Sequence, residues 1–110
     1  MNDAELYEFG RIYFEEGNYK DSLSMLSKLY DVNKNYNQRE VARMLLWIYT
    51  ENEYYNARKV VDFFEILRER FPELYIPFNK ILVVGKAYRE IGEFERAYLV
   101  YKATIDASFV

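Results

Sequence analysis

The residues that could support catalysis are few in this chain. Its 110 residues include neither histidine nor cysteine, so the commonest general base, the thiol nucleophile and the usual nitrogen and sulfur ligands of zinc are absent. Glu15 and Glu16 are adjacent carboxylates at a predicted helix end, where water would surround both groups and give them no separate roles. The serines and lysines within residues 20–28 form a pattern that a solvated helix face explains. We therefore expect no enzymatic activity and no cofactor.

Residues 31–38 are the stretch whose spacing comes nearest to a metal site. Oxygen-bearing side chains alternate there, as they do in the first half of a calcium-binding loop. Tyr36, however, occupies the position where such a loop needs glycine, and Ala42 the position where it needs a bidentate glutamate. The stretch is instead expected to be a polar connector, and we predict no metal site.

The charge and hydropathy of the chain narrow the classes of partner. The formal net charge is −3, whereas proteins that bind the nucleic-acid backbone usually carry a basic excess. The first residues are acidic and polar, unlike a secretory signal, and the longest apolar runs, residues 44–49 and 81–84, are far shorter than the ~20 residues of a membrane span. We expect no nucleic-acid or membrane partner, and a cytoplasmic location if the chain is full length.

Two stretches share one pattern of glycine, aromatic and small residues. Residues 10–26 and 85–101 align so that Gly10 corresponds to Gly85, and together they hold all four glycines of the chain. A glycine inside a helix costs roughly 1 kcal/mol relative to alanine, so its use at matching places implies a shared geometric demand. We predict that Gly10 and Gly85 each let a second helix approach closely, with small residues on the facing helix. These small residues are Ser22 and Ala97.

Local signals predict the ends of the helices. Asn2, Asn18 and Asn37 are each followed three residues later by an acidic residue, which is typical of a helix start. Gly17 favours a helix end because glycine readily takes the left-handed conformation, and Pro72 disfavours helix at the residue before it. The chain is therefore expected to form antiparallel hairpins joined by short turns.

Apolar spacing extends this prediction over the whole chain. The pattern breaks over residues 50–53 and resumes at Tyr54, and it places Phe9 and Phe94 on inner helix faces. The result is one all-α domain, residues 1–110, with about six helices in three hairpins. The hairpins are expected at residues 3–36, 38–72 and 78–110.

The hairpins resemble the tetratricopeptide repeat in the order of their large, small and aromatic residues. The first hairpin carries the resemblance through Leu6, Phe9, Gly10, Tyr13, Ser22 and Leu26, and the third through Ile81, Val84, Gly85, Tyr88, Ala97 and Tyr101. The middle hairpin matches more weakly through Val41, Met44, Ile48, Tyr54, Ala57 and Val61. The resemblance implies a right-handed superhelix of stacked hairpins, an α-solenoid, that acts as a protein-interaction scaffold.

In such an array the first helix of each hairpin lines a groove that holds a partner. Helical spacing predicts a partner-binding groove made of Tyr7, Arg11, Phe14, Arg39, Arg43, Leu46, Tyr49, Asn79, Leu82, Lys86 and Arg89, with Ala42 on the same face. Apolar rings and cationic heads suit an extended or helical peptide with acidic and hydrophobic residues. The alternative is that the aromatic residues pack on neighbouring helices and the basic residues pair with nearby acids, namely Glu8, Glu15, Glu40 and Glu90.

The last predicted helix favours a second class of function, assembly. It is apolar on nearly every side, and a solenoid normally finishes with a polar-faced helix. We predict self-association through Tyr98, Leu99 and Val100, either as a homodimer or within a longer array. The alternative is that these side chains are simply tolerated at the surface.

Overall fold

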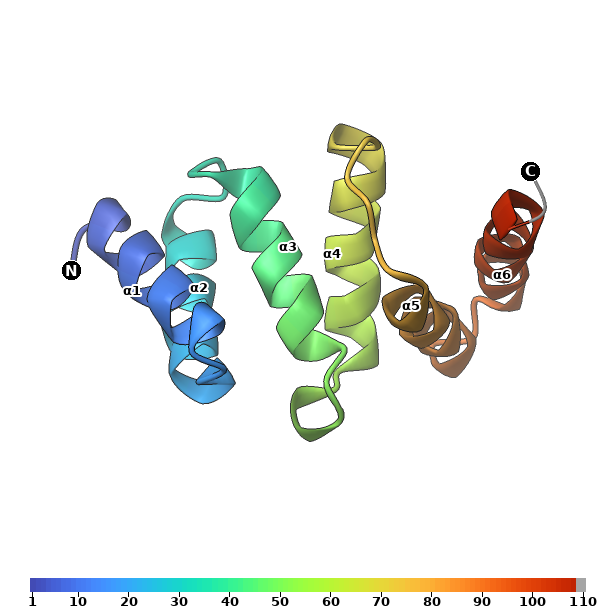
Figure 1. The fold of residues 1–110 in the computed structure, drawn as a ribbon, viewed down its shortest axis with the longest axis horizontal. Coiled ribbons are helices and arrows are strands. Elements are labelled where there is room, and N and C mark those ends of the chain that lie inside the picture. The colour runs from blue at the N-terminus through green and yellow to red at the C-terminus, as the bar shows by residue number, and fades with distance from the viewer. Residues whose placement is uncertain (109–110) are drawn as a thin grey trace. The chain divides into compact units, whose positions relative to one another are not determined.

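The protein is all-helical, as the sequence predicts. The computed structural model describes residues 1–108, which form six α-helices and a short 3-10 turn and contain no strand (Figure 1). The first helix contacts the second, the fourth contacts the fifth and the fifth contacts the sixth, which is compatible with an α-helical repeat. The elements are α1 (Asp3–Glu15), α2 (Tyr19–Val32), α3 (Gln38–Tyr49), η1 (Asn52–Tyr54), α4 (Ala57–Arg70), α5 (Phe78–Glu90) and α6 (Phe94–Ser108).

The chain divides into two compact units, Met1–Ile48 and Tyr49–Val110. Unit 1 contains α1, α2 and nearly all of α3, whereas unit 2 contains η1 and α4 to α6. The predicted middle hairpin, residues 38–72, spans the boundary, so its two helices belong to different units. No helix within residues 1–108 is long and apolar enough to span a membrane.

The predicted helix ends of the first hairpin are confirmed. The Asn2 side chain accepts a hydrogen bond from the Glu5 backbone N–H at 2.8 Å, and the Glu5 carboxylate accepts one from the Asn2 N–H at 3.0 Å, which together form a capping box. Gly17 has φ +77°, a left-handed conformation that favours glycine. Asn18 caps α2 through a bond from the Asp21 N–H. Asn2 therefore sets where α1 begins, Gly17 where it ends, and Asn18 where α2 begins.

Close helix approach in the first hairpin depends on Gly10. A Cβ at this position would lie 2.5 Å from Leu26 Cδ2, so the two helices could not pack as they do with any larger residue. The Ser22 hydroxyl donates a buried hydrogen bond of 2.7 Å to the Gly10 carbonyl. The predicted roles of both small residues are confirmed.

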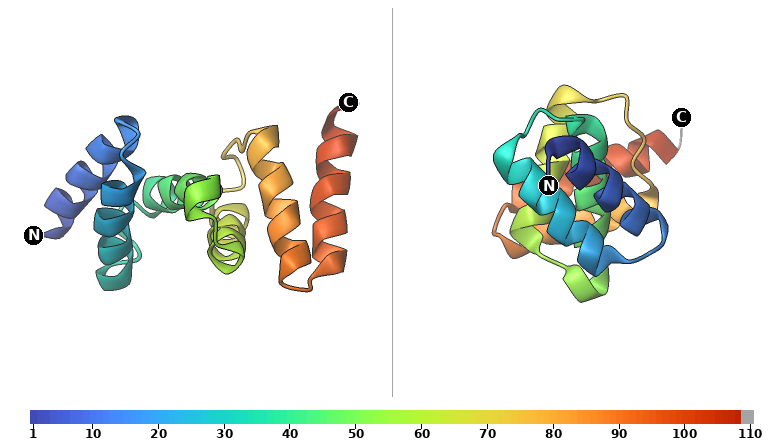
Figure 2. Two further views of the ribbon diagram at one scale, coloured as in Figure 1. Left: turned by 90° about the horizontal axis from the view of Figure 1, so that it is seen from below. Right: turned by 90° about the vertical axis from the view of Figure 1, so that its left-hand side faces the viewer.

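The third hairpin repeats this arrangement within unit 2. Helices α5 and α6 run side by side in opposite directions (Figure 2). A Cβ at Gly85 would overlap the ring of Tyr101, and Ala97 is buried. Gly92, at the turn between the helices, has φ +85°. The glycine pattern of the sequence thus corresponds to one packing solution used in both units.

Three local predictions are wrong. Helix α4 begins at Ala57 rather than Tyr54, because the Asn56 side chain accepts a hydrogen bond from the Lys59 N–H and η1 occupies the preceding residues. Phe9 and Phe94 are exposed, although their spacing places them inward. The inner face is instead formed by Leu6 and Gly10 in α1 and by Ala97 in α6, which are buried.

Each unit buries its own set of apolar side chains. In unit 1 the buried residues are Leu6, Leu26, Leu29, Val41, Ala42, Met44, Leu45, Leu46 and Ile48. In unit 2 they are Val60, Val61, Phe63, Phe64, Leu67, Leu74, Ile76, Val84, Ala87, Tyr88 and Ala97. Leu74 and Ile76 belong to the connector, residues 71–77, which is therefore anchored on the core of unit 2 at alternate positions.

Candidate interaction surfaces

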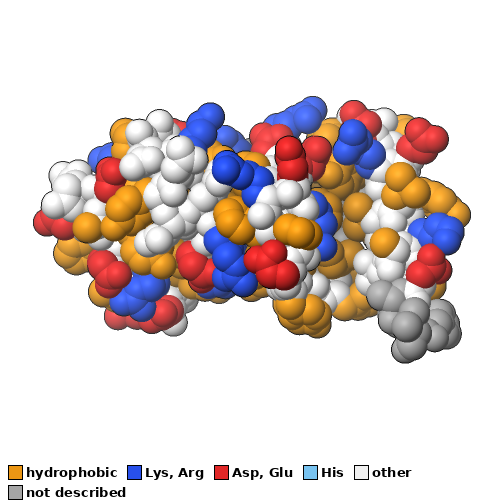
Figure 3. Space-filling view, turned by 90° about the horizontal axis from the view of Figure 1, so that it is seen from above, with side chains coloured by type: hydrophobic (Ala, Val, Ile, Leu, Met, Phe, Trp, Pro, Cys, Tyr) orange, Lys and Arg blue, Asp and Glu red, His pale blue; other side chains and the backbone are white. Residues whose placement is uncertain are grey.

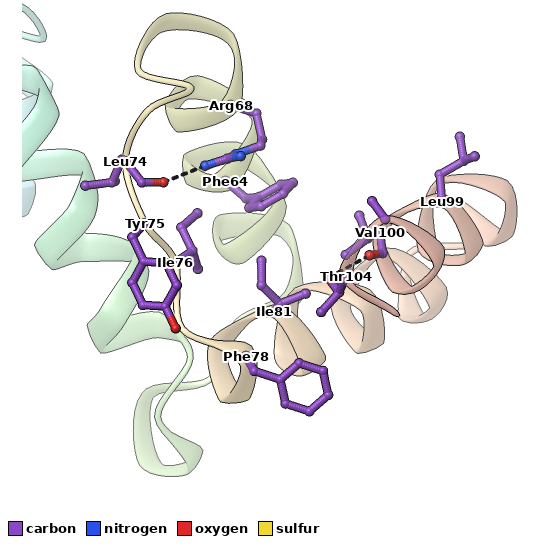
Figure 4. Close-up of a pocket in the computed structure, with 11 residues that line it drawn as sticks. Phe64, Arg68, Leu74, Tyr75, Ile76, Phe78, Ile81, Leu99, Val100 and Thr104 are labelled. Atoms are coloured by element: carbon purple, nitrogen blue, oxygen red, sulfur yellow. Dashed lines mark hydrogen bonds between the residues drawn. The ribbon is translucent and has the colours of Figure 1, made fainter. Parts of the chain in front are cut away.

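A hollow in unit 2 lies between α4, the connector, α5 and α6. It has a volume of about 630 Å³. Side chains of Phe64, Ile76 and Ile81 lie on one side of the cavity, and Val100 and Thr104 lie on the other (Figure 4). The remaining lining residues are Arg68, Leu74, Tyr75, Phe78, Leu99 and Ala103.

This larger cavity is almost wholly apolar at its lining. Among the described residues that line it, Arg68 is the only charged one. The Thr104 hydroxyl donates to the Val100 carbonyl at 3.0 Å, so a polar group of the wall is already bonded within its own helix. The space-filling view shows hydrophobic side chains gathered in a hollow of the surface, with charged side chains around it (Figure 3). A concave apolar surface with one charged group has the composition of a binding site.

The position of Arg68 is fixed by two contacts inside unit 2. Its Nη2 donates to the Leu74 carbonyl oxygen at 2.9 Å, and its guanidinium lies 5.7 Å from the centroid of the Phe64 ring. Among the described residues, no carboxylate forms an ion pair with it. Arg68 thus presents a net positive charge at the rim of the larger cavity.

A smaller cavity of about 370 Å³ adjoins the larger one. It shares Phe64, Arg68, Leu99 and Val100 with the larger cavity and adds polar residues of α4, α5 and α6. These added residues are Glu65, Glu69, Tyr88 and Arg96. Because the two cavities share four lining residues, they adjoin, and we call them together the α4–α6 groove.

Polar contacts define the far end of the α4–α6 groove. Arg96 Nη1 lies 3.5 Å from Glu65 Oε2, so an ion pair joins α6 to α4 there. Burial, with a smaller contribution from the Glu65 carboxylate, raises the pKa of Tyr88 to about 12. Tyr88 packs edge-on against Phe64 with 6.2 Å between ring centroids. With this raised pKa, Tyr88 keeps its proton up to a pH well above 10.

In unit 1, Arg43 contacts two aromatic rings, one of which belongs to Phe14 of the predicted groove. Its guanidinium lies 5.5 Å from the centroid of Phe14 and 5.4 Å from that of Trp47. Arg43 also bonds to Glu40, with Nη2 and Oε1 at 3.2 Å. Trp47 is a neighbour that sequence reasoning missed, although its position four residues after Arg43 on one helix is the signal that could have identified it.

The other predicted residues of unit 1 are also engaged. Arg11 bonds to Glu8 and Glu15, both at 2.9 Å, and Arg39 bonds to Glu40 at 2.6 Å. Tyr7 packs on the ring of Tyr36 with 5.9 Å between centroids. Burial, and secondarily the Glu40 carboxylate, raises the pKa of Tyr7 above its usual value. The alternative interpretation, in which the arginines pair with neighbouring acids, is confirmed for these residues.

The prediction that Leu46 is accessible to a partner is wrong. Leu46 is 0% exposed, and so is Ala42 on the same predicted face. The physical reason is that α3 carries buried residues around most of its circumference, including Met44, Leu45 and Ile48. A helix of this kind presents no free apolar face.

Within unit 2, the predicted groove residues do not converge on the α4–α6 groove. Tyr49 stacks on Phe63 with 6.1 Å between ring centroids. The Lys86 ammonium lies 3.9 Å from Glu90 Oε1 and 4.6 Å from the centroid of Tyr55. The rest of the set, Asn79, Leu82 and Arg89, is exposed on α5.

The residues predicted for self-association have different environments. Leu99 and Val100 both line the α4–α6 groove. Tyr98 lines neither of its cavities, and 61% of its surface is exposed. Two of the three residues predicted for self-association, Leu99 and Val100, therefore line the α4–α6 groove, which α6 shares with α4.

No protein-family model matches the sequence, and neither the curated proteins nor the solved structures provide a significant match.

Proposed function

We propose that this protein is a non-catalytic interaction module, similar in kind to tetratricopeptide scaffolds, which holds a segment of a partner protein. The observation that carries the proposal is the α4–α6 groove. Its larger cavity is apolar, and exposed apolar side chains surround it, including Tyr75, Phe78 and Leu99. Apolar surface of this extent around a concavity is typical of a protein-binding site.

The close packing of the hairpins supports the relation to helical repeat scaffolds. Gly10 with Leu26 and Gly85 with Tyr101 form the same small-to-large contact at matching positions. These hairpins leave their polar backbone groups bonded within helices, so their surfaces offer side chains for recognition. A scaffold can bind its partner through these surface side chains alone.

The first-helix surface is proposed as a secondary contact for the partner. In unit 1 it comprises Tyr7, Arg11, Phe14, Arg39 and Arg43, and in unit 2 Asn79, Leu82, Lys86 and Arg89. The cations of this surface that form ion pairs with their own helix are exposed or half-exposed, and such pairs exchange partners at little cost. The double variant Arg43→Glu with Lys86→Glu should therefore weaken partner capture but not abolish it.

A matched pair of substitutions on α6 tests the main proposal. Leu99 is 58% exposed and lines the groove, whereas its neighbour Tyr98 is similarly exposed and does not. Proteins retained from lysate by the wild-type chain would be identified by mass spectrometry and compared with those retained by Leu99→Glu and Tyr98→Glu. We expect Leu99→Glu to lose specific partners that Tyr98→Glu keeps. Equal retention by all three proteins would contradict the proposal.

Self-association through α6 is a second candidate function. It is favoured by the exposure of Tyr98, Leu99 and Ile105 on this one helix. Sedimentation of the purified chain would then show a dimer, and both Tyr98→Glu and Leu99→Glu should dissociate it. A monomer at every concentration tested would remove this candidate.

A further inference from the structure

The α4–α6 groove has a definite length. On α6 its lining residues run from Arg96 to Thr104. At a rise of about 1.5 Å per residue this part of the helix extends over about 12 Å, or roughly two helical turns. The combined space of about 630 Å³ and 370 Å³ is enough for several large side chains of an occupant.

The walls of the groove limit how an occupant can be recognised. Two of them are α4 and α6, in which backbone N–H and C=O groups bond within the helix. These helical walls offer no strand edge for a peptide to extend, so along them recognition comes from side chains that enter the cavities. An amphipathic helix places apolar side chains at i, i+3, i+4 and i+7 on one face, which fits a depression of this length.

The charge of the groove further specifies the occupant. Within the described part of the chain, Arg68 is the only charged residue lining the larger cavity, and no carboxylate there pairs with it. The bond to the Leu74 carbonyl and the contact with the Phe64 ring hold its guanidinium at the rim. A guanidinium in a fixed position is complementary to a carboxylate and binds it through charge-assisted hydrogen bonds.

We infer that the α4–α6 groove binds an amphipathic helix of another protein, whose apolar face enters the cavities and whose Asp or Glu pairs with Arg68. This inference rests on the proposed interaction function and deepens it. Beyond Arg68, the smaller cavity is lined by the ion pair between Glu65 and Arg96 and by the carboxylate of Glu69, which disfavours a second acidic side chain there. The acidic residue of the occupant is therefore expected at Arg68, on the side of the larger cavity.

Selection from a random peptide library tests this inference directly, because any sequence that fits the groove can be enriched. Peptides of about fifteen residues, enough for four helical turns, would be displayed on phage and selected on the full chain. Selections on Leu99→Glu and Arg68→Glu would run in parallel. On the wild type we expect a consensus of apolar residues at helical spacing with one Asp or Glu. On Arg68→Glu the acidic position should change to Lys or Arg.

Affinity measurements on a selected peptide give the quantitative test. Arg68→Gln should weaken binding about tenfold, because a charge-assisted hydrogen bond is lost. Arg70 is exposed on the same helix and lines neither cavity, so Arg70→Gln is the matched control and should leave the affinity unchanged. Circular dichroism would confirm that each variant is folded and that the peptide becomes helical on binding.

The outcomes separate the two levels of the argument. Peptides that require Leu99 but carry no acid, ignore Arg68→Gln or bind in extended form would overturn the inference and leave the interaction module standing. Peptides that bind Leu99→Glu as well as the wild type, or no enrichment at all, would overturn both.

Discussion

Gly10 and Gly85 hold the same place in their hairpins, but the side chains they face differ in freedom. Leu26, opposite Gly10, is completely buried, whereas Tyr101, opposite Gly85, is half-buried and contacts the glycine through the far end of its ring. Helix propensity alone predicts that alanine would stabilise either helix by roughly 1 kcal/mol. Close packing opposes this gain in stability. The effect is strongest at Gly10, because the buried side chain of Leu26 cannot move away from an added methyl group.

We therefore expect Gly10→Ala to lower the free energy of unfolding by ~1 to 3 kcal/mol, as overpacking of a core does. Gly85→Ala should cost less because the Tyr101 ring can swing outward. Thermal or urea unfolding would measure both, with Ser24→Ala on an exposed face of α2 as the control. If Gly10→Ala proved as stable as the wild type, the close approach of α1 and α2 would not be a steric requirement.

The sequence was most informative where one residue acts on its own backbone. Asn2 and Gly17 set helix ends through contacts within a few residues, so their roles could be predicted without the tertiary structure. Leu46 is the opposite case. Its burial depends on how much of the α3 surface is covered, and spacing along the helix does not contain that information.

At the scale of the elements, the start of α4 shows how a side chain overrides an apolar pattern. Asn56 is extended, with φ −147° and ψ 108°, and its side-chain oxygen accepts a hydrogen bond from the Lys59 N–H at 3.1 Å. Residues 52–54 form the separate turn η1. The apolar spacing from Tyr54 onward predicted a longer helix, because spacing contains no information on the hydrogen bond that the Asn56 side chain accepts.

Loss of this cap should weaken unit 2. We expect Asn56→Ala to reduce stability by about 0.5–2 kcal/mol, the usual range for a helix N-cap. Asn35→Ala, at an exposed position between α2 and α3, serves as the control and should change stability little. Urea unfolding followed by circular dichroism measures the difference. Equal stability of the two variants would mean that the Asn56 bond is not needed to begin α4.

The α4–α6 groove could not be predicted from any one element. Its residues come from α4, the connector, α5 and α6, and are spread over positions 64–104 of the sequence. Leu99 and Val100 were identified as an apolar surface of α6, but their relation to Phe64 requires the tertiary arrangement of unit 2. Sequence patterns thus indicated that α6 carries an apolar surface and missed the concavity it shares with α4.

For the whole molecule, two tyrosines predict how stability depends on pH. Burial, and secondarily Glu65, raises the pKa of Tyr88 from its usual 10.0 to about 12. Burial, together with its 2.7 Å hydrogen bond to Glu90, also raises the pKa of Tyr55. Between about pH 10 and pH 12 the unfolded chain loses protons that the folded chain keeps, so ionisation favours unfolding.

We therefore expect the free energy of unfolding to be unaffected by these groups below about pH 10 and to fall as the pH rises towards 12. Denaturant titrations at a series of alkaline pH values would measure this. The double variant Tyr55→Phe with Tyr88→Phe should show a shallower decline than the wild type. The same decline in both proteins would assign the alkaline effect to other groups.

The connector at residues 71–77 has a consequence for how such a protein could acquire a new ligand. It is longer than the turn between α5 and α6, and its buried residues Leu74 and Ile76 line the larger cavity. In a chain built from helical pairs, inserting a few residues between pairs opens a recess while the contacts inside each pair are kept. Evolution or a designer could thus add or erase specificity by changing loop length, and leave the packing within each pair untouched.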